Sequence, residues 1–137
     1  MTKLIEPSIF AIERGKPLME TLLKYAQERK LPSASISGLG ALQDPTLGYF
    51  DFNIGNYHFN TIKGLYELIS LNGNITKYQG EYVVHVHVAL GNDQYQVFGG
   101  HLKEAIVGVT AEITITPLTS SVNRKPDLDT HLNLIHS

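Results

Sequence analysis

The clearest pattern in the chain is a strand-like alternation of apolar and polar residues between Val83 and Leu90. Neighbouring side chains in a β-strand point to opposite faces, so His85 and His87 share one face. The other face is apolar and is formed by Val84, Val86, Val88 and Leu90. The alternation therefore predicts a strand with a core face and a polar face that carries two imidazoles.

Similar patterns predict the elements on either side. Residues 8–13 suit a first strand, and helical spacing after Pro17 predicts a helix that ends near Lys30. A further strand is expected over residues 33–40. Residues 106–116 predict a half-buried strand, because apolar and polar residues alternate there. The apolar row is Val107, Val109, Ala111, Ile113 and Ile115, and the polar row consists of threonines with one glycine and one glutamate.

Turn-forming residues divide the rest of the chain into short β-like runs. These dividers are Asp44-Pro45, Gly55-Asn56, Gly64, Asn72-Gly73-Asn74, Gly80 and Gly91-Asn92-Asp93. Their spacing predicts an antiparallel sheet with few helices.

Length and composition narrow the class of protein. The 137 residues, 42% of them hydrophobic, suit a single domain with a sizeable core. A net charge of −2 and scattered basic residues disfavour direct binding of nucleic acid by this chain alone. The absence of cysteine excludes disulfides and thiolate metal sites. No apolar run is long enough for a signal peptide or membrane span, so we expect a cytoplasmic protein without membrane contact.

A third histidine, His101, follows the pair after a predicted hairpin, and its face depends on the hairpin loop. If Gly91–Asp93 form the loop, His101 lies opposite Val83, on the face of the histidine pair and within reach of a shared ion. If only Asn92 and Asp93 form the loop, His101 pairs with Val84 and points into the core. A bulge at Gly99-Gly100 would then restore the alternation.

Three imidazoles with a fourth position open to water are a usual arrangement of catalytic zinc. His85, His87 and His101 are therefore candidate ligands of a divalent metal ion, with zinc as the first choice. Iron, copper and nickel also accept three imidazoles. The remaining histidines have no partner at ligand spacing and are expected on the surface; they are His58, His131 and His136.

Two carboxylates are candidates for catalytic roles beside such an ion. Glu112 stands alone in the polar row of the predicted strand 106–116, and Glu67 sits within the otherwise apolar run 65–69. Each is a candidate fourth ligand, an anchor for a histidine N–H, or a general base acting on metal-bound water. The alternative for each is an ordinary solvated or edge-strand carboxylate.

Several segments in a fixed order resemble the PPC domain, whose name refers to plants and prokaryotes. The segments are Gly38-Leu39-Gly40-Ala41-Leu42, Leu47-Gly48-Tyr49-Phe50, Tyr66-Glu67-Leu68-Ile69-Ser70-Leu71-Asn72-Gly73-Asn74-Ile75, His85-Val86-His87-Val88, Gly99-Gly100-His101-Leu102 and Val109-Thr110-Ala111-Glu112-Ile113. The resemblance implies an α+β fold, with a curved, mainly antiparallel sheet and one main flanking helix, assembled as a homotrimer. Residues 1–137 would then be a single PPC-like domain, with a core of about 8–118 and a C-terminal tail of about 119–137.

The same resemblance bears on function. In plants the domain is joined to AT-hook motifs in DNA-binding regulators, where it supplies oligomerisation and partner contacts. This chain has no Arg-Gly-Arg-Pro hook, and Leu65 stands where the plant segment Gly-Arg-Phe-Glu-Ile-Leu has arginine. The histidine trio instead looks like the prokaryotic form. A more distant likeness, at the level of fold, is to acetolactate decarboxylase, a zinc enzyme with a His-x-His pair and a later histidine.

Two functions remain open. One is a homotrimeric metal-binding module with a regulatory or DNA-associated role. The other is a zinc-dependent enzyme that acts on a small oxygenated substrate, with Glu67 or Glu112 moving the proton. An open coordination position in a pocket lined by a carboxylate would favour the enzyme, whereas a closed site on a flat surface would favour the module.

Overall fold

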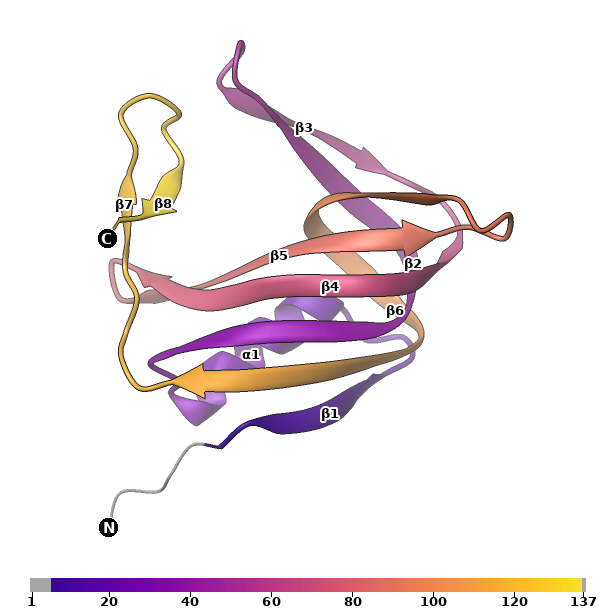
Figure 1. Ribbon diagram of the computed structural model, residues 1–137, viewed down its shortest axis with the longest axis horizontal. Coiled ribbons are helices and arrows are strands. Elements are labelled where there is room, and N and C mark those ends of the chain that lie inside the picture. Colours follow the sequence, from indigo (N-terminus) through magenta and orange to yellow (C-terminus); the bar gives the residue numbers. More distant parts are fainter. Residues whose placement is uncertain (1–5, 137) are drawn as a thin grey trace.

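The computed structural model describes residues 6–136 as one helix and a strongly bent antiparallel sheet (Figure 1). The elements are β1 (Ser8–Glu13), α1 (Leu18–Arg29), β2 (Ser33–Asp51), β3 (Asn56–Thr61), β4 (Leu65–Tyr78), β5 (Glu81–Gly91), β6 (Val97–Leu118), β7 (Arg124–Pro126) and β8 (Asn133–Ile135). The main sheet has the order β1-β6-β5-β4-β2-β3, and a second small sheet pairs β7 with β8. The predicted α+β class, with a curved antiparallel sheet and one flanking helix, is confirmed.

Strand β6 bends so sharply that it pairs with separate parts of the main sheet (Figure 1). Its first residues pair with β5, and its later residues lie between β1 and β2. Register shifts against β2 accompany the bend and interrupt the alternation of faces. Val109, which the sequence pattern assigns to the apolar row, is therefore 59% exposed, while Val107 and Ala111 on either side are buried.

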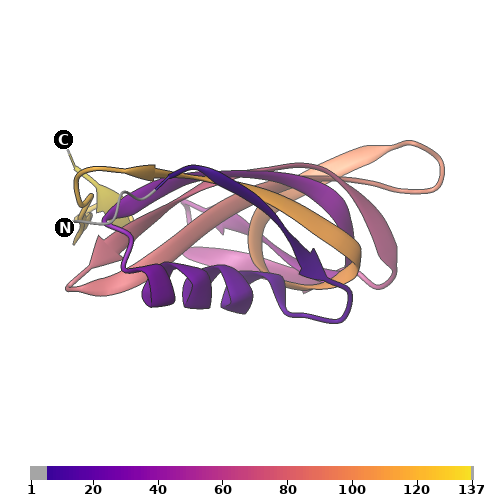
Figure 2. The same ribbon diagram turned by 90° about the horizontal axis from the view of Figure 1, so that it is seen from below.

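The core lies between α1 and the sheet face that the helix covers (Figure 2). Leu18, Leu22 and Ala26 recur every four residues, so they form one stripe of the helix and are fully buried. The strand residues that complete the core include Ile36, Leu42, Leu71, Ile75, Val86, Leu90, Val107, Ile113 and Ile115. The polar face of β5, with its histidines, points away from this core. Within residues 6–136, no helix has the length and apolarity needed to cross a bilayer.

A carboxylate far along the chain caps the start of the helix. Pro17, the residue before α1, makes no side-chain cap. Glu104 of β6 instead accepts hydrogen bonds from the backbone N–H groups of Met19, at 2.8 Å, and Glu20, at 3.3 Å. A carboxylate at this end satisfies N–H groups that lack partners within the helix and is favourable for the helix dipole. The helix ends at Arg29, and the capping residue Lys30 has a left-handed backbone conformation. The predicted end near Lys30 is therefore confirmed.

Two of the predicted dividers are wrong because strands β2 and β4 continue through them. Asp44-Pro45 lies inside β2, where Asp44 has a φ of 49° beside a register shift, so the strand bends there without a turn. Residues 72–74 lie in the middle of β4, where a Cβ on Gly73 would collide with the carbonyl oxygen of His85. The predicted break at Gly91-Asn92-Asp93 is confirmed, but the loop there spans residues 92–96. The predicted breaks at Gly55-Asn56, Gly64 and Gly80 are confirmed.

The end of the chain forms a hairpin of its own, which we call the C-terminal hairpin (residues 122–136). Its two strands, β7 and β8, stand beside the end of the main sheet where β5 begins (Figure 1). The backbone N–H of Lys77 on β4 donates to the carbonyl of Val122 at 2.9 Å. The sequence marks this region only as a C-terminal tail of about 119–137, so the paired hairpin is a feature of the tertiary structure.

The distant cap of α1 can be tested by mutation. Glu104→Ala is expected to lower the free energy of unfolding by about 1 kcal/mol, because two backbone N–H groups of the helix lose their acceptor. Urea denaturation monitored by circular dichroism measures the change. Glu28→Ala, an exposed glutamate later in the same helix, is the matched control and should change stability by less than about 0.5 kcal/mol. Equal effects of the two substitutions would contradict the capping role.

Candidate metal centre

The three candidate histidines come from two adjacent strands. His85 and His87 lie on β5, and His87 is directly opposite His101 on β6. Both predicted registers are wrong, because the five-residue loop 92–96 moves His101 four positions along β5 from Val83 to His87. An even displacement keeps the face unchanged, since side chains alternate with a period of two. No register shift occurs at Gly99-Gly100, so no bulge is needed.

The imidazoles converge on one point outside the core. One ligand nitrogen from each of the three rings lies within 4.8 Å of the other two. The Nε2 atoms of His85 and His87 are 3.2 Å apart. Nitrogens bound to one tetrahedral zinc ion at about 2.0–2.1 Å are separated by about 3.3 Å. The arrangement therefore needs only small side-chain movements to hold an ion.

A buried atom at His101 fits the same interpretation. Among residues 6–136, its Nδ1 is the one buried side-chain nitrogen or oxygen without a hydrogen-bond partner. A buried polar atom without a partner is costly, and an imidazole nitrogen with a free lone pair is a metal ligand. The donor set of three imidazoles suits a borderline-soft divalent ion such as zinc.

The surroundings of His85 and His101 favour the neutral form of the two rings. The pKa of His85 is lowered from 6.5 to about 4, mainly by burial and then by the nearby charges of His87, Arg124 and His101. Burial, followed by the charge of His87, also lowers the pKa of His101. Only the neutral imidazole offers a lone pair to a metal. His85 and His101 are therefore able to offer lone pairs to a cation at neutral pH.

Polar side chains of β4 border the histidines on the side opposite β6. Asn72 lies opposite His87, and Asn74 lies opposite His85. Both asparagines lie in the segment 72–74, which the residue pattern predicts to be a turn. Their spacing of two residues matches that of the histidine pair, and this match is the signal that would have identified them as neighbours on adjacent strands.

Arg124, from the C-terminal hairpin, also reaches the centre. Its Nη2 atom lies 3.5 Å from Nδ1 of His85 and donates to Oδ1 of Asn74 at 3.0 Å. Burial lowers the pKa of the guanidinium below its usual value. Nothing in the local sequence marks this residue, because Arg124 and its exposed neighbour Lys125 are equally basic residues in a polar stretch.

The β2–β3 hairpin borders His101 on its remaining side. The ring of Tyr57 on β3 lies 5.0 Å from the ring of His101, measured between centroids. Tyr57 also stacks on Phe59, at 5.2 Å between centroids, and the Nζ atom of Lys103 lies 4.6 Å from the ring of Phe59. A row of aromatic rings therefore lies beside the third histidine, and no sequence motif indicated it.

The structure does not bring either candidate carboxylate to the histidines. Glu67 is exposed on β4 opposite Gly91, four positions along β5 from His87, which corresponds to about 13 Å. Glu112 is exposed on β6 opposite Leu39. It is separated from β5 by β4 and β2, a lateral distance of about 14 Å. In residues 6–136, the cluster of possible ligands contains histidines alone.

The other histidines lie outside the cluster, as expected. His58 is exposed and pairs with Asp51 at 3.0 Å, which lowers the pKa of that carboxyl group. His131 and His136 are exposed in the C-terminal hairpin.

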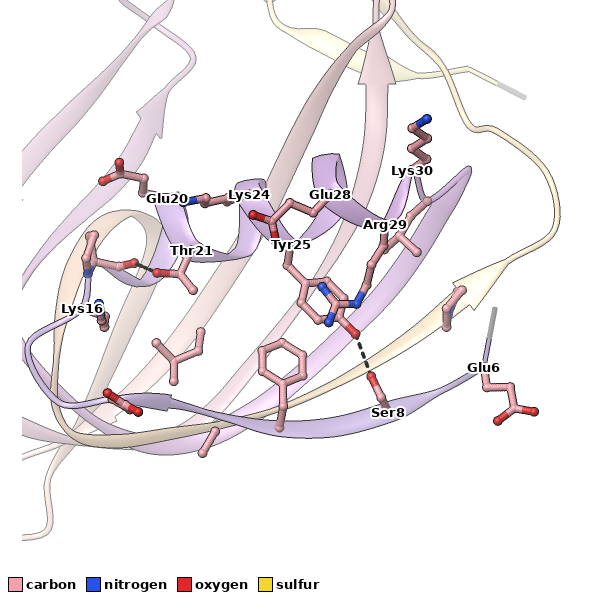
Figure 3. Close-up of a pocket in the computed structure, with 17 residues that line it drawn as sticks. Glu6, Ser8, Lys16, Glu20, Thr21, Lys24, Tyr25, Glu28, Arg29 and Lys30 are labelled. Atoms are coloured by element: carbon pink, nitrogen blue, oxygen red, sulfur yellow. Dashed lines mark hydrogen bonds between the residues drawn. The ribbon is translucent and has the colours of Figure 1, made fainter. Parts of the chain in front are cut away.

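A separate open groove runs between α1 and β1 (Figure 3). Its volume is about 1220 Å³, and none of the three histidines lines it. At its centre Tyr25 stacks on Phe10, lies under the guanidinium of Arg29 and hydrogen bonds with the hydroxyl of Ser8 at 2.8 Å. Acidic and basic side chains alternate around it, so no single charge is concentrated there.

Comparison with known proteins gives consistent matches over nearly the whole chain. The model of the Plants and Prokaryotes Conserved (PCC) domain, the family abbreviated PPC above, matches residues 2–119. A PPC protein from Pyrococcus horikoshii is 36% identical, with a TM-score of 0.90, over 100% of this chain and 95% of that one. No curated protein matches the chain.

Two further solved structures have names that bear on function. One from Bacteroides thetaiotaomicron, provisionally named a DNA-binding protein, is 26% identical with a TM-score of 0.92, over 98% of this chain and 94% of that one. One from Archaeoglobus fulgidus, described as a metal-containing protein, is 27% identical with a TM-score of 0.88, over 98% of this chain and 96% of that one.

A more distant likeness concerns the fold alone. Acetolactate decarboxylase from Bacillus subtilis is 13% identical with a TM-score of 0.62, over 89% of this chain and 57% of that one. At this identity the match indicates a shared architecture and carries no information on substrate.

The lowered histidine pKa values predict how stability depends on pH. In chelator-treated protein, the free energy of unfolding should fall as the pH decreases from about 6.5 towards about 4. In this range His85 binds a proton in the unfolded chain but not in the folded protein, so a lower pH favours the unfolded state. Urea denaturation at a series of pH values measures the slope. His85→Gln should reduce it, whereas the exposed His58→Gln should reduce it less. An unchanged slope in His85→Gln would contradict this assignment.

Proposed function

Because this chain belongs to the Plants and Prokaryotes Conserved domain family, we propose that it is a homotrimeric module that binds a divalent metal ion, with zinc as the first choice. His85, His87 and His101 are the ligands. The module serves a regulatory or DNA-associated role, in which contact with DNA is made through a partner protein.

One observation carries the metal assignment: the three ligand nitrogens lie within 4.8 Å of one another on two paired strands. The three imidazoles are distant in the sequence and converge outside the core, so burial of apolar surface does not explain their convergence. The lowered pKa values of His85 and His101 and the partnerless Nδ1 of His101 support the same assignment. The description of the Archaeoglobus fulgidus protein as metal-containing is further support.

The homotrimer is supported by apolar side chains on the face that the helix leaves uncovered. Ile9 is 76% exposed, Leu39 is 53% exposed and Val109 is 59% exposed, on strands β1, β2 and β6. Exposed apolar side chains on neighbouring strands are typical of surfaces that associate. Self-association would remove them from water.

The DNA-associated part of the proposal rests on the provisional name of the Bacteroides thetaiotaomicron protein. The net charge of −2 gives this chain no general attraction for phosphate. A role through a partner protein is consistent with both facts.

The three-ligand cluster also favours a second candidate function, a zinc-dependent enzyme acting on a small oxygenated substrate. Structural zinc sites have four protein ligands, whereas catalytic sites have three and an open position. The cluster in residues 6–136 supplies three. Neither Glu67 nor Glu112, the carboxylates that the sequence suggested as proton carriers, lies near the histidines, because each is held in a paired strand away from them. Turnover of small hydroxy or keto acids by zinc-loaded protein, abolished in His87→Ala, would favour the enzyme over the module.

The metal assignment is tested by elemental analysis of protein purified without a histidine tag. Wild-type protein is expected to carry about one zinc ion per chain, and His87→Ala about tenfold less, because one of three ligands is lost. His58→Ala, an exposed histidine paired with Asp51, is the matched control and should retain the metal. Circular dichroism confirms folding of each variant. Equal metal content in wild type and His87→Ala would refute the assignment.

The oligomeric state is tested by sedimentation equilibrium. The expected mass is that of three chains of 15.2 kDa each. Leu39→Asp places a charge on the exposed apolar face and should shift the equilibrium toward smaller species. A monomer at every concentration would contradict the trimer. It would not affect the metal assignment, which elemental analysis tests separately.

A further inference from the structure

Arg124 fastens the C-terminal hairpin to the main sheet. Among residues 6–136 it is the one charged side chain that is buried, with 8% exposure. Its Nε atom donates to Oγ1 of Thr76 at 2.7 Å and its Nη2 atom to Oδ1 of Asn74 at 3.0 Å, both on β4. Its Nη1 atom donates to the carbonyl of Asn133 on β8 at 3.1 Å. This side chain therefore joins both strands of the hairpin to the sheet.

The same guanidinium determines where His85 carries its proton. A guanidinium has N–H donors and no acceptor, so Nδ1 of His85, 3.5 Å from Nη2 of Arg124, can only accept. A neutral ring then has its hydrogen on Nε2. That atom is 3.2 Å from Nε2 of His87, to which it donates. Arg124, His85 and His87 thus form a chain of hydrogen bonds.

An ion bound to His85 is incompatible with this chain of hydrogen bonds. Coordination through Nε2 requires the lone pair there, so the ring hydrogen moves to Nδ1 and faces another donor on Arg124. Coordination through Nδ1 places the ion where Arg124 makes its contact. No carboxylate in the described residues forms a salt bridge with Arg124, so its charge also repels a divalent cation.

We propose that Arg124 is a positioning residue that makes metal binding at the three-histidine centre and docking of the C-terminal hairpin mutually antagonistic. The inference rests on the proposed metal site. Loading the centre weakens the Arg124 contacts and loosens residues 122–136, and the docked hairpin lowers the affinity of the centre for the ion. Linkage requires that both effects have the same free energy. The hairpin is therefore the part of the surface that changes when the ion binds.

The first measurement uses the intact wild-type chain. Hydrogen exchange followed by mass spectrometry compares residues 122–136 with and without Zn²⁺. Exchange in this segment should become faster on loading, by about tenfold if the coupling is in the usual range for linked sites. Helix α1, on the other face of the sheet, is the internal reference and should not change. His101→Ala, which removes a ligand that does not touch Arg124, should abolish the response to Zn²⁺.

The second measurement is the affinity for Zn²⁺, determined by titration calorimetry. Arg124→Gln should bind the ion about tenfold more tightly than wild type, because the competing donor is removed. Lys125→Gln is the matched control. It loses the same charge from the next residue of β7, but Lys125 is exposed. Its affinity should change by less than about twofold.

The outcomes separate this inference from the proposed function. Faster exchange of the hairpin in loaded wild type, together with tighter binding by Arg124→Gln, supports the coupling. Zinc binding with unchanged or slower exchange overturns the coupling and leaves the metal site standing. Weaker binding by a folded Arg124→Gln also overturns it, because Arg124 would then assist the ion. Failure of wild type to bind Zn²⁺ overturns both.

Discussion

The cross-strand pairing of His87 with His101 is the constraint on which the candidate site depends. The strand β5 alone would supply two imidazoles, and a pair on one strand is commonly an ordinary polar face. The antiparallel register between β5 and β6 places the third ring directly opposite the second. The ligand nitrogens are thereby held within 4.8 Å of one another, although their residues lie up to 16 positions apart in the sequence. The metal centre depends on this register.

Close backbone packing on both sides of β5 supports that register. A Cβ on Gly73 of β4 would collide with the carbonyl of His85, and one on Gly99 of β6 would collide with the carbonyl of Val88. Glycine is therefore required on each neighbour at the point of closest approach. The apolar face of β5 is fixed as well, because Val86 and Leu90 are fully buried in the core. A shift by one residue would exchange these two faces.

The electrostatics of the centre combine two opposing features. Burial keeps His85 and His101 neutral, which suits a cation, whereas the nearby guanidinium of Arg124 opposes one. Such an arrangement is not the best one for simple tight binding of an ion. It is consistent with a centre whose occupancy is linked to another part of the molecule, in this protein the C-terminal hairpin.

Local sequence determined the first strand, the helix and its end, the face of the histidine pair and the antiparallel α+β architecture. These depend on side-chain alternation, helical spacing and backbone preferences within a few residues. Tertiary structure alone decided the length of the loop 92–96, the continuity of β2 and β4 through turn-like residues, and the position of Arg124 beside His85. Each of these is fixed by contacts between segments distant in the chain, such as the pairing of β4 with β5, so no local pattern contains the information.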